Sequence, residues 1–203
     1  MRTELLIVVD YQNDFVTGKL PVPMATKIAP IIQNEINNNK YDVIAYTFDT
    51  HTKKDYVTSE EAKLFPDIHC EFKTSGWNFF HIKPRFNKEF ETHLKNLNEP
   101  RDFQVHNEFF FMKDKFSIWE GNQNFEPFMK KFNPKDTNIT VVGVATNYCV
   151  FMNVIGLLER GYNVTINQKA VMGITHLPTG EIDVSYAENV EVMNNAGVVW
   201  KIQ

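Results

Sequence analysis

The sequence predicts an α/β protein: a doubly wound sheet of about six mainly parallel strands with helices on both faces. Two observations predict this class. Short, continuously apolar runs alternate with longer segments of helical spacing, and no internal repeat or domain linker interrupts the 203 residues. Uninterrupted apolar runs are typical of strands covered on both faces, and strand–helix alternation gives parallel sheets with right-handed crossovers. We therefore expect residues 1–203 to form a single domain.

The first half of the chain carries two predicted strands and one predicted helix. Residues 5–9 and 43–48 are apolar and rich in β-branched or aromatic side chains, which favours strands. Between them, residues 24–38 place several isoleucines near one helical face. Residues 49–104 are polar, aromatic and irregular, and a long segment of this kind inside a compact domain is usually functional or partly disordered.

The second half continues the alternation of strands and helices. Arg160-Gly161 marks the end of one helix, because glycine readily adopts the left-handed conformation that closes many helices. Further strands are predicted at 109–112, 138–142, 162–166 and 198–202, and helices at 124–132, 148–160 and 181–195.

Composition and charge narrow the classes of function. The net charge is −4 and the Lys and Arg residues are scattered, so nucleic acid is not the expected partner. No apolar run approaches the roughly 20 residues of a membrane span, and the first residues lack the layout of a signal peptide. Two cysteines exclude a disulfide scaffold. We expect a cytoplasmic protein that acts on a small molecule and does not bind a membrane.

Cys149 stands where a predicted strand turns into a predicted helix. The free N–H groups and positive dipole end of a helix N-terminus favour a thiolate, so Cys149 is a candidate nucleophile. The alternative is a small, buried and inert side chain, which is common for free cysteine. Cys70 lies in a loop without a helix start, and we interpret it as structural or incidental.

Asp10 and Lys113 directly follow the predicted strands 5–9 and 109–112. Because ligands gather beyond the carboxyl ends of parallel strands, both side chains are expected near Cys149. A carboxylate there can accept the thiol proton, and a lysine can favour ionised groups or polarise a carbonyl. Taken singly, Asp10 is better explained as a turn-forming or capping aspartate and Lys113 as a solvated lysine, and Asp14 and Lys115 are competitors.

A second cluster of polar residues follows the strand 43–48. Asp49 and His51 share one side of an extended segment, and Glu60, Glu61 and His69 lie downstream. Imidazoles and carboxylates together suit a divalent metal, with zinc first and iron or manganese as alternatives. A polar loop with incidental histidines explains the irregular spacing equally well.

Aromatic side chains flank these polar candidates. They can form the walls of a pocket for a flat ring, although ordinary core packing explains each of them singly. The aromatic residues are Phe15, Phe65, Trp77, Phe116 and Trp119.

Several motifs contain the candidate residues. They are VDYQNDF at 9–15, LPVP at 20–23, DTH at 49–51, KDKFSIW at 113–119 and GVATNYCV at 143–150. Through these motifs, residues 5–174 resemble the nicotinamidase/isochorismatase-like cysteine hydrolases and imply the isochorismatase-like hydrolase fold.

The resemblance assigns roles to the triad and to one turn. It implies a catalytic triad of Asp10, Lys113 and Cys149, with Lys113 selected over Lys115 by its distance from the aromatic–Ser pair. It also implies a cis peptide before Ala145, and an oxyanion hole formed by Ala145 and Cys149.

The nicotinamidase branch of the family implies a metal site and an aromatic pocket. The metal ligands would be Asp49, His51 and His69, with Glu61 rather than Glu60 as the fourth ligand. The wall positions match Phe15, Phe65 and Trp119.

The expected activity is hydrolysis of nicotinamide to nicotinate and ammonia through a cysteine thioester, as a step of NAD salvage in a homo-oligomer. One alternative is a metal-independent cysteine hydrolase of the same family that acts on another small amide, carbamoyl compound or ureide. The other is a non-catalytic protein that binds a pyridine ligand.

Overall fold

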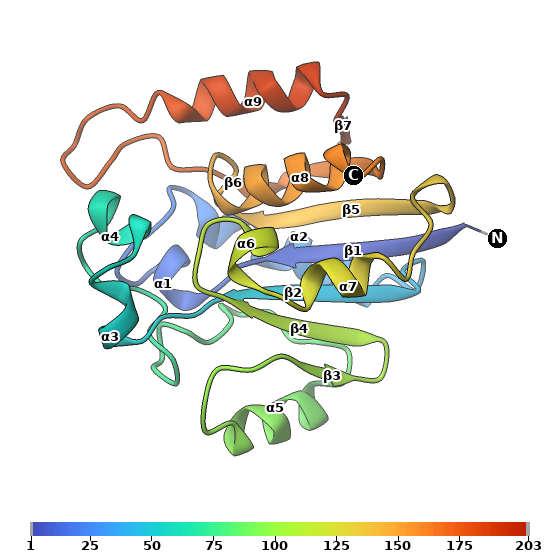
Figure 1. Ribbon diagram of the computed structural model, residues 1–203, viewed down its shortest axis with the longest axis horizontal. Helices are drawn as coiled ribbons and strands as arrows, with labels where there is room; N and C mark the ends of the chain where they lie inside the picture. Colours follow the sequence, from blue (N-terminus) through green and yellow to red (C-terminus); the bar gives the residue numbers. More distant parts are fainter. Residues whose placement is uncertain (1, 202–203) are drawn as a thin grey trace.

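A computed structural model describes residues 2–201 of the chain. Within these residues the strands form one seven-stranded sheet (Figure 1). The strand order is β3-β4-β2-β1-β5-β6-β7. The short β3 pairs antiparallel with β4, and every other neighbouring pair is parallel. The strands are β1 (Thr3–Val9), β2 (Val43–Asp49), β3 (Phe103–Val105), β4 (Glu108–Lys113), β5 (Thr137–Val144), β6 (Asn163–Met172) and β7 (Val199–Lys201).

The predicted α/β class is confirmed, with one strand more than expected. All six predicted strands are present, and β3 is the addition: its three residues fall inside the segment that we had interpreted as irregular. The strand predicted at 162–166 continues to Met172, past a shift in its register with β5 between Val141 and Gly143. The end of the last predicted strand, Ile202, lies outside the described residues.

The helices differ most from expectation in the region between β2 and β4. Three helices occur there, two of them with only four or five residues, which is too short for a helical period to show in the sequence. The helices are α1 (Asn13–Val16), α2 (Ala29–Asn37), α3 (Lys53–Tyr56), α4 (Glu60–Leu64), α5 (Asn87–Asn96), α6 (Ile118–Gly121), α7 (Phe125–Met129), α8 (Cys149–Glu159) and α9 (Ser185–Asn195), with 3-10 turns at Ala25–Lys27 and Pro134–Asp136.

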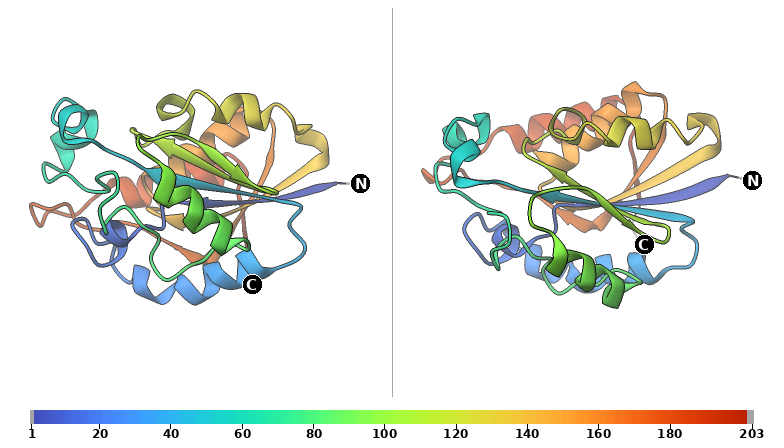
Figure 2. Two further views of the ribbon diagram at one scale, coloured as in Figure 1. Left: turned by 90° about the horizontal axis from the view of Figure 1, so that it is seen from below. Right: turned by 60° about the horizontal axis from the view of Figure 1, so that its bottom comes forward.

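Helices cover both faces of the sheet (Figure 2). One core cluster joins alternate residues of β1, such as Leu6 and Val8, to α2 and α5. The other joins the intervening residues, such as Leu5 and Ile7, to α7 and α8. This alternation explains why the strands are continuously apolar: each side chain faces one of two dry layers. The carboxyl ends of β1, β2, β4 and β5 meet at the left of Figure 1, beside α1, α3 and α4.

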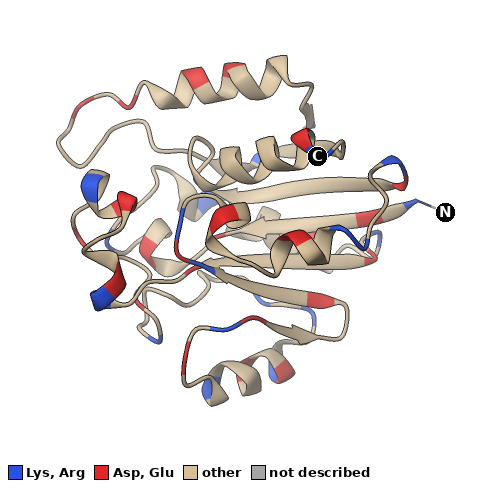
Figure 3. Ribbon diagram, viewed as in Figure 1, with Lys and Arg blue, Asp and Glu red and all other residues tan. Residues whose placement is uncertain are grey.

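Charged side chains of both signs are interleaved along the ribbon (Figure 3). Within residues 2–201, no helix has both the length and the apolar character needed to cross a bilayer.

Candidate active site

Four polar residues meet at the carboxyl edge of the sheet. Asp10 directly follows β1, Asp49 ends β2, Lys113 ends β4, and Cys149 begins α8 after β5. Asp49 and Lys113 are partners in the β2–β4 ladder, which places their side chains next to each other. All four are buried, with exposed fractions of 5% or less.

Lys113 is the centre of the group. Its Nζ lies 2.9 Å from Asp10 Oδ2, 2.8 Å from Asp49 Oδ1 and 3.5 Å from Cys149 Sγ. Thr47 donates from Oγ1 to Asp10 Oδ1 at 2.5 Å and so fixes the second oxygen of that carboxylate. The three residues that the sequence proposed as a triad are therefore brought together around one buried ammonium group.

The protonation preferences of these groups follow from burial and from one another. Burial raises the pKa of the Cys149 thiol well above its ordinary value; Lys113 lowers that pKa and Asp10 raises it. The helix start was expected to favour a thiolate, but burial has the larger effect and favours the neutral thiol. Burial also raises the pKa of Asp10 against the opposing effect of Lys113, whereas Asp10 and Asp49 overcome burial and keep the pKa of Lys113 well above normal. The arrangement is a neutral thiol, a charged lysine and an aspartate of increased basicity.

The turn before Cys149 presents free backbone N–H groups. A cis peptide joins Val144 to Ala145. The Ala145 carbonyl accepts from the N–H of Tyr148 at 3.0 Å and of Val150 at 3.1 Å. Within the described chain, neither Ala145 nor Cys149 donates its own N–H to an acceptor. Two backbone donors from residues that line the space beside the thiol are therefore available to a substrate oxygen.

Next to the triad lies a cluster of two imidazoles and two carboxylates. One ligand atom each from Asp49, His51, Glu61 and His69 lies within 4.8 Å of the others, and all four residues are buried. His51 Nε2 is 2.9 Å from Asp49 Oδ2 and 3.1 Å from Glu61 Oε2. His69 Nε2 is 3.3 Å and 3.5 Å from the same two oxygens. Backbone hydrogen bonds between His51 and the 70–72 turn bring His69 to the end of β2.

The cluster fits a divalent metal. Ligand atoms about 2.0–2.2 Å from a tetrahedral metal are separated by ~3.4 Å, close to the distances observed here. Glu61 Oε1 is buried and has no hydrogen-bond partner among the described residues, so a bound cation would compensate this oxygen. Glu60, the competing candidate, is exposed and pairs with Lys63 at 2.6 Å. The geometry therefore favours Glu61.

Without a metal, the carboxylates hold protons on the two histidines. Burial lowers the pKa of His51, but Asp49 and Glu61 raise it more, to about 10. The same balance raises the pKa of His69 to about 9. Tyr56 lies beside the outer nitrogen of His69, with its hydroxyl 3.1 Å from Nδ1. This contact orients the ring so that Nε2 faces the cluster.

A small, mostly apolar cavity adjoins the thiol. It is lined by Phe15, Leu20, Glu61, Phe65, His69, Phe116, Ala145, Tyr148, Cys149 and Ile174. Phe15 and Phe65 thus lie where the resemblance implied. The ring of Phe15 is 5.2 Å from that of His69. A wider polar cleft runs past Lys113 and His51, but Cys149 does not line it, so the small cavity is the candidate substrate site.

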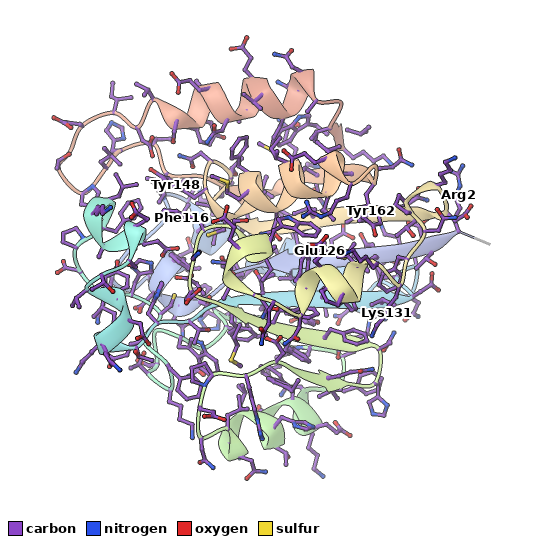
Figure 4. All side chains as sticks on the ribbon, viewed as in Figure 1. Arg2, Phe116, Glu126, Lys131, Tyr148 and Tyr162 are labelled. Atoms are coloured by element: carbon purple, nitrogen blue, oxygen red, sulfur yellow. The ribbon has the colours of Figure 1, made fainter. Side chains whose placement is uncertain are left out.

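Trp119, expected as a third wall residue, is not among the residues that line this cavity. The short helix α6 directs its ring onto α8, where Nε1 donates to the Asn153 carbonyl at 3.3 Å. The Arg160 guanidinium lies 3.9 Å over the ring, and a Cβ on Gly156 would collide with it. Phe116 takes the wall position instead, 5.2 Å from Tyr148 (Figure 4).

Sequence reasoning missed three residues that shape the site. Gln12 donates to the Asp49 carbonyl at 2.9 Å and accepts from the Asp49 N–H at 2.8 Å, and so clamps the backbone of the shared carboxylate. Thr47 holds Asp10, and Tyr148 forms part of the cavity wall. Gln12 and Tyr148 lie inside the quoted motifs, which was the available signal; nothing local distinguishes Thr47 from any strand threonine.

Comparisons with known proteins agree with this architecture. The family model described as Isochorismatase domain matches residues 4–181. No curated protein sequence matches the chain. Among solved structures, the chain is similar to a pyrazinamidase of Pyrococcus horikoshii in complex with zinc, with a TM-score of 0.72 and 24% identity, covering 98% of this chain and 99% of that chain.

Two further structures show the range of these likenesses. One is a nicotinamidase/pyrazinamidase from Bacillus subtilis, with a TM-score of 0.69, 21% identity and 98% of both chains covered. The other is an N-carbamoylsarcosine amidase from Thermoplasma acidophilum, with a TM-score of 0.64 and 15% identity, covering 98% of this chain and 96% of that chain. At these identities the likeness shows a shared fold.

Proposed function

The chain belongs to the isochorismatase family, and from that membership and the geometry of its site we propose that it is a cysteine amidase that hydrolyses nicotinamide to nicotinate and ammonia. One observation carries the proposal: Lys113 contacts Asp10, Asp49 and Cys149 at once, and Asp49 also belongs to the cluster of metal-ligand type. A nucleophile, a base and a site that can orient a ring nitrogen thus share one buried centre.

The first half of the proposed reaction forms a thioester. Asp10 accepts the proton of Cys149, and the sulfur attacks the amide carbon. The N–H groups of Ala145 and Cys149 stabilise the negative charge that develops on the carbonyl oxygen. Lys113 holds Asp10 in place and supports the thiolate. The C–N bond then breaks as Asp10 returns the proton to the departing nitrogen, which leaves as ammonia.

The second half releases the acid. Asp10 takes a proton from water, and the water oxygen attacks the thioester carbon. Asp10 returns that proton to the sulfur as the C–S bond breaks, which gives the thiol and the acid, and the acid ionises to the carboxylate product. Asp49, His51, Glu61 and His69 would hold a divalent metal, which when bound supplies a Lewis acid able to bind a pyridine nitrogen. The aromatic walls of the cavity would keep the ring flat beside the thiol.

A metal-independent hydrolase of the same family is the second candidate. The N-carbamoylsarcosine amidase among the similar structures supports it, because its name points to a carbamoyl substrate on this fold. The buried ligand cluster supports the first candidate, because two imidazoles and two carboxylates within 4.8 Å of one another are a donor set that suits a divalent metal. A non-catalytic binder has no use for a thiol packed against Lys113. We place the activity in cytoplasmic NAD salvage.

Ammonia release from a panel of amides tests the proposal. The panel contains nicotinamide, pyrazinamide, benzamide and N-carbamoylsarcosine, and metal content is measured on the same samples. We expect the wild type to favour the pyridine amide and Cys149→Ala to lose all measurable hydrolysis, while Cys70→Ala serves as the matched cysteine control. Near-wild-type hydrolysis by Cys149→Ala would overturn the proposal. Full activity on nicotinamide after chelation, or in His51→Ala, would favour the metal-independent candidate.

A further inference from the structure

The buried carboxylate of Asp183 is hydrogen-bonded to the turn that precedes Cys149. Asp183 lies between β6 and α9 with an exposed fraction of 7%. Its Oδ2 accepts from the Tyr148 hydroxyl at 2.7 Å and from Asn147 Nδ2 at 3.1 Å. Its Oδ1 accepts from the N–H of Ser185 at 3.0 Å and from the Ser185 hydroxyl at 2.6 Å. One side chain thus joins the first turn of α9 to the two residues before Cys149.

Asn147 fastens the same turn from a second direction. Its Oδ1 accepts from the Ile174 N–H at 3.0 Å, and its Nδ2 donates to the Ile174 carbonyl at 3.1 Å. Asn189 of α9 donates to the Asn147 carbonyl at 2.8 Å. The turn that offers the free N–H groups of Ala145 and Cys149 is therefore fixed by residues that follow β6.

Tyr148 connects this anchor to the cavity. Its ring lies 5.5 Å from that of Phe65 and 5.2 Å from that of Phe116, and all three residues line the space beside the thiol. Because the hydroxyl is bonded to Asp183, the ring cannot swing about χ1 without breaking that bond, whereas a turn about χ2 leaves the hydroxyl oxygen in place. The polar tip is therefore held by Asp183, and the ring lines the cavity.

The anchor lies beyond the family match. That match ends at residue 181, two residues before Asp183, so membership of the family does not assign a role to this carboxylate.

We propose that Asp183 is a positioning residue that holds Tyr148 as one wall of the cavity and thereby favours flat aromatic amides over aliphatic ones. The inference rests on the proposed function, since it takes the small cavity to be where the amide binds. It adds a determinant of specificity that acts from outside the triad and the ligand cluster. Asp183 itself touches no reacting atom.

Steady-state kinetics on nicotinamide and on isobutyramide test the proposal. Tyr148→Phe is expected to raise KM for nicotinamide about tenfold and to leave kcat within about threefold, because only the buried bond that orients the ring is lost while the triad is intact. Asp183→Ala should raise KM by at least as much and also lower kcat, because it frees Asn147 and the turn that offers the N–H groups of Ala145 and Cys149. The ratio of kcat/KM for the aromatic over the aliphatic amide should fall in both. The double variant should resemble Asp183→Ala, since the bond that Tyr148→Phe removes is among those that Asp183→Ala removes.

Two matched controls separate positioning from a general weakening of this segment. Glu181→Ala removes an exposed carboxylate from the same loop, and Tyr186→Phe removes a hydroxyl that has no hydrogen-bond partner among the described residues. Both should keep the wild-type KM. The inference is overturned if the controls raise KM as much as Asp183→Ala does, or if Asp183→Ala and Tyr148→Phe leave KM and the aromatic preference unchanged.

A readout without amide turnover distinguishes failure of this inference from failure of the proposed function. The rates at which 2-chloroacetamide and its N-benzyl derivative alkylate Cys149 are compared by mass spectrometry. We expect Asp183→Ala and Tyr148→Phe to reduce the benzyl-over-parent rate ratio. If the wild type hydrolyses no amide, yet the two variants have a lower benzyl-over-parent rate ratio than the wild type, the function proposal fails and the inference stands. If the wild type is an amidase and the ratio does not change, the inference alone fails.

Discussion

Lys113 and Asp49 form a buried ion pair that joins the nucleophile to the ligand cluster. Lys113 Nζ lies 2.8 Å from Asp49 Oδ1, while Asp49 Oδ2 lies 2.9 Å from His51 Nε2. The two oxygens of one carboxylate therefore serve two sites. Gln12 holds the backbone of Asp49 from both sides, so the carboxylate can shift little toward either neighbour.

Asp49→Asn is expected to impair both sites at once. The neutral amide removes one of two carboxylates from a buried lysine, which should lower the free energy of unfolding by about 3–5 kcal/mol in urea titrations. It also removes a charged ligand, so the affinity of the protein for the metal should fall at least about 100-fold. His51→Ala should lose metal but retain alkylation of Cys149. Asp67→Asn, at an exposed position, is the control, and equal effects of Asp49→Asn and Asp67→Asn would contradict the shared role.

Glu61 and its neighbour offer a direct test of the fourth ligand. Glu61→Gln should reduce metal content after dialysis and lower kcat/KM about 10–100-fold, because it replaces a buried carboxylate of the cluster. Glu60→Gln should leave both unchanged, since that side chain is exposed and pairs with Lys63. Metal analysis with activity on the same samples measures the difference. Equal loss in the two variants would show that the cluster does not use Glu61 selectively.

Metal binding to the metal-free protein is expected to release protons. At pH 7 both His51 and His69 are charged, because their pKa values are about 10 and about 9. Binding a divalent metal requires neutral imidazoles, so about two protons should leave per metal. Calorimetry in buffers of different ionisation enthalpy counts them. The number should fall toward zero above pH 10, and the affinity should rise over the same range; no release at pH 7 would contradict the pairing.

The same histidines set the pH dependence of stability without metal. Their pKa values in the folded chain lie above the ordinary 6.5, so the folded state binds more protons than the unfolded state between pH 6.5 and about 10. The stabilisation is complete below pH 6.5 and is lost as the pH rises through about 9 to 10. Urea unfolding of chelated protein should therefore show stability falling over this window. His51→Gln should flatten the fall, and a rise in stability would contradict the assignment.

Much of the fold could be predicted because its strands are covered on both faces. Runs such as residues 5–9 need no alternation, so their apolar character alone marks them. The strand Phe103–Val105 escaped because it has three residues, sits at the sheet edge and has one intermediate, one exposed and one buried side chain. The helices α3 and α4 escaped for lack of length, and there the capping residues Thr52 and Ser59 were the remaining signal.

The candidate site was predictable where chemistry coincides with a strand end. Asp10, Asp49 and Lys113 each follow directly from the position of a strand, and the topology brings them together. Trp119 shows the limit, because its direction depends on a four-residue helix that the sequence did not reveal. Asp183 shows another: its partner Tyr148 lies 35 residues away, and no local pattern connects them.

Replacing Trp119 should mainly reduce stability, whereas replacing Phe116 should mainly weaken substrate binding. Trp119→Ala removes a ring that packs on α8 beneath Arg160, so the free energy of unfolding should fall by about 2–4 kcal/mol while KM for the preferred amide stays within about twofold. Phe116→Ala removes a ring that lines the cavity beside Tyr148, so KM should rise about tenfold with a smaller loss of stability. Urea unfolding and steady-state kinetics on both variants separate the two effects. A raised KM in Trp119→Ala with unchanged stability would restore Trp119 to the substrate wall, because a residue that packs only on α8 has no other route to the cavity.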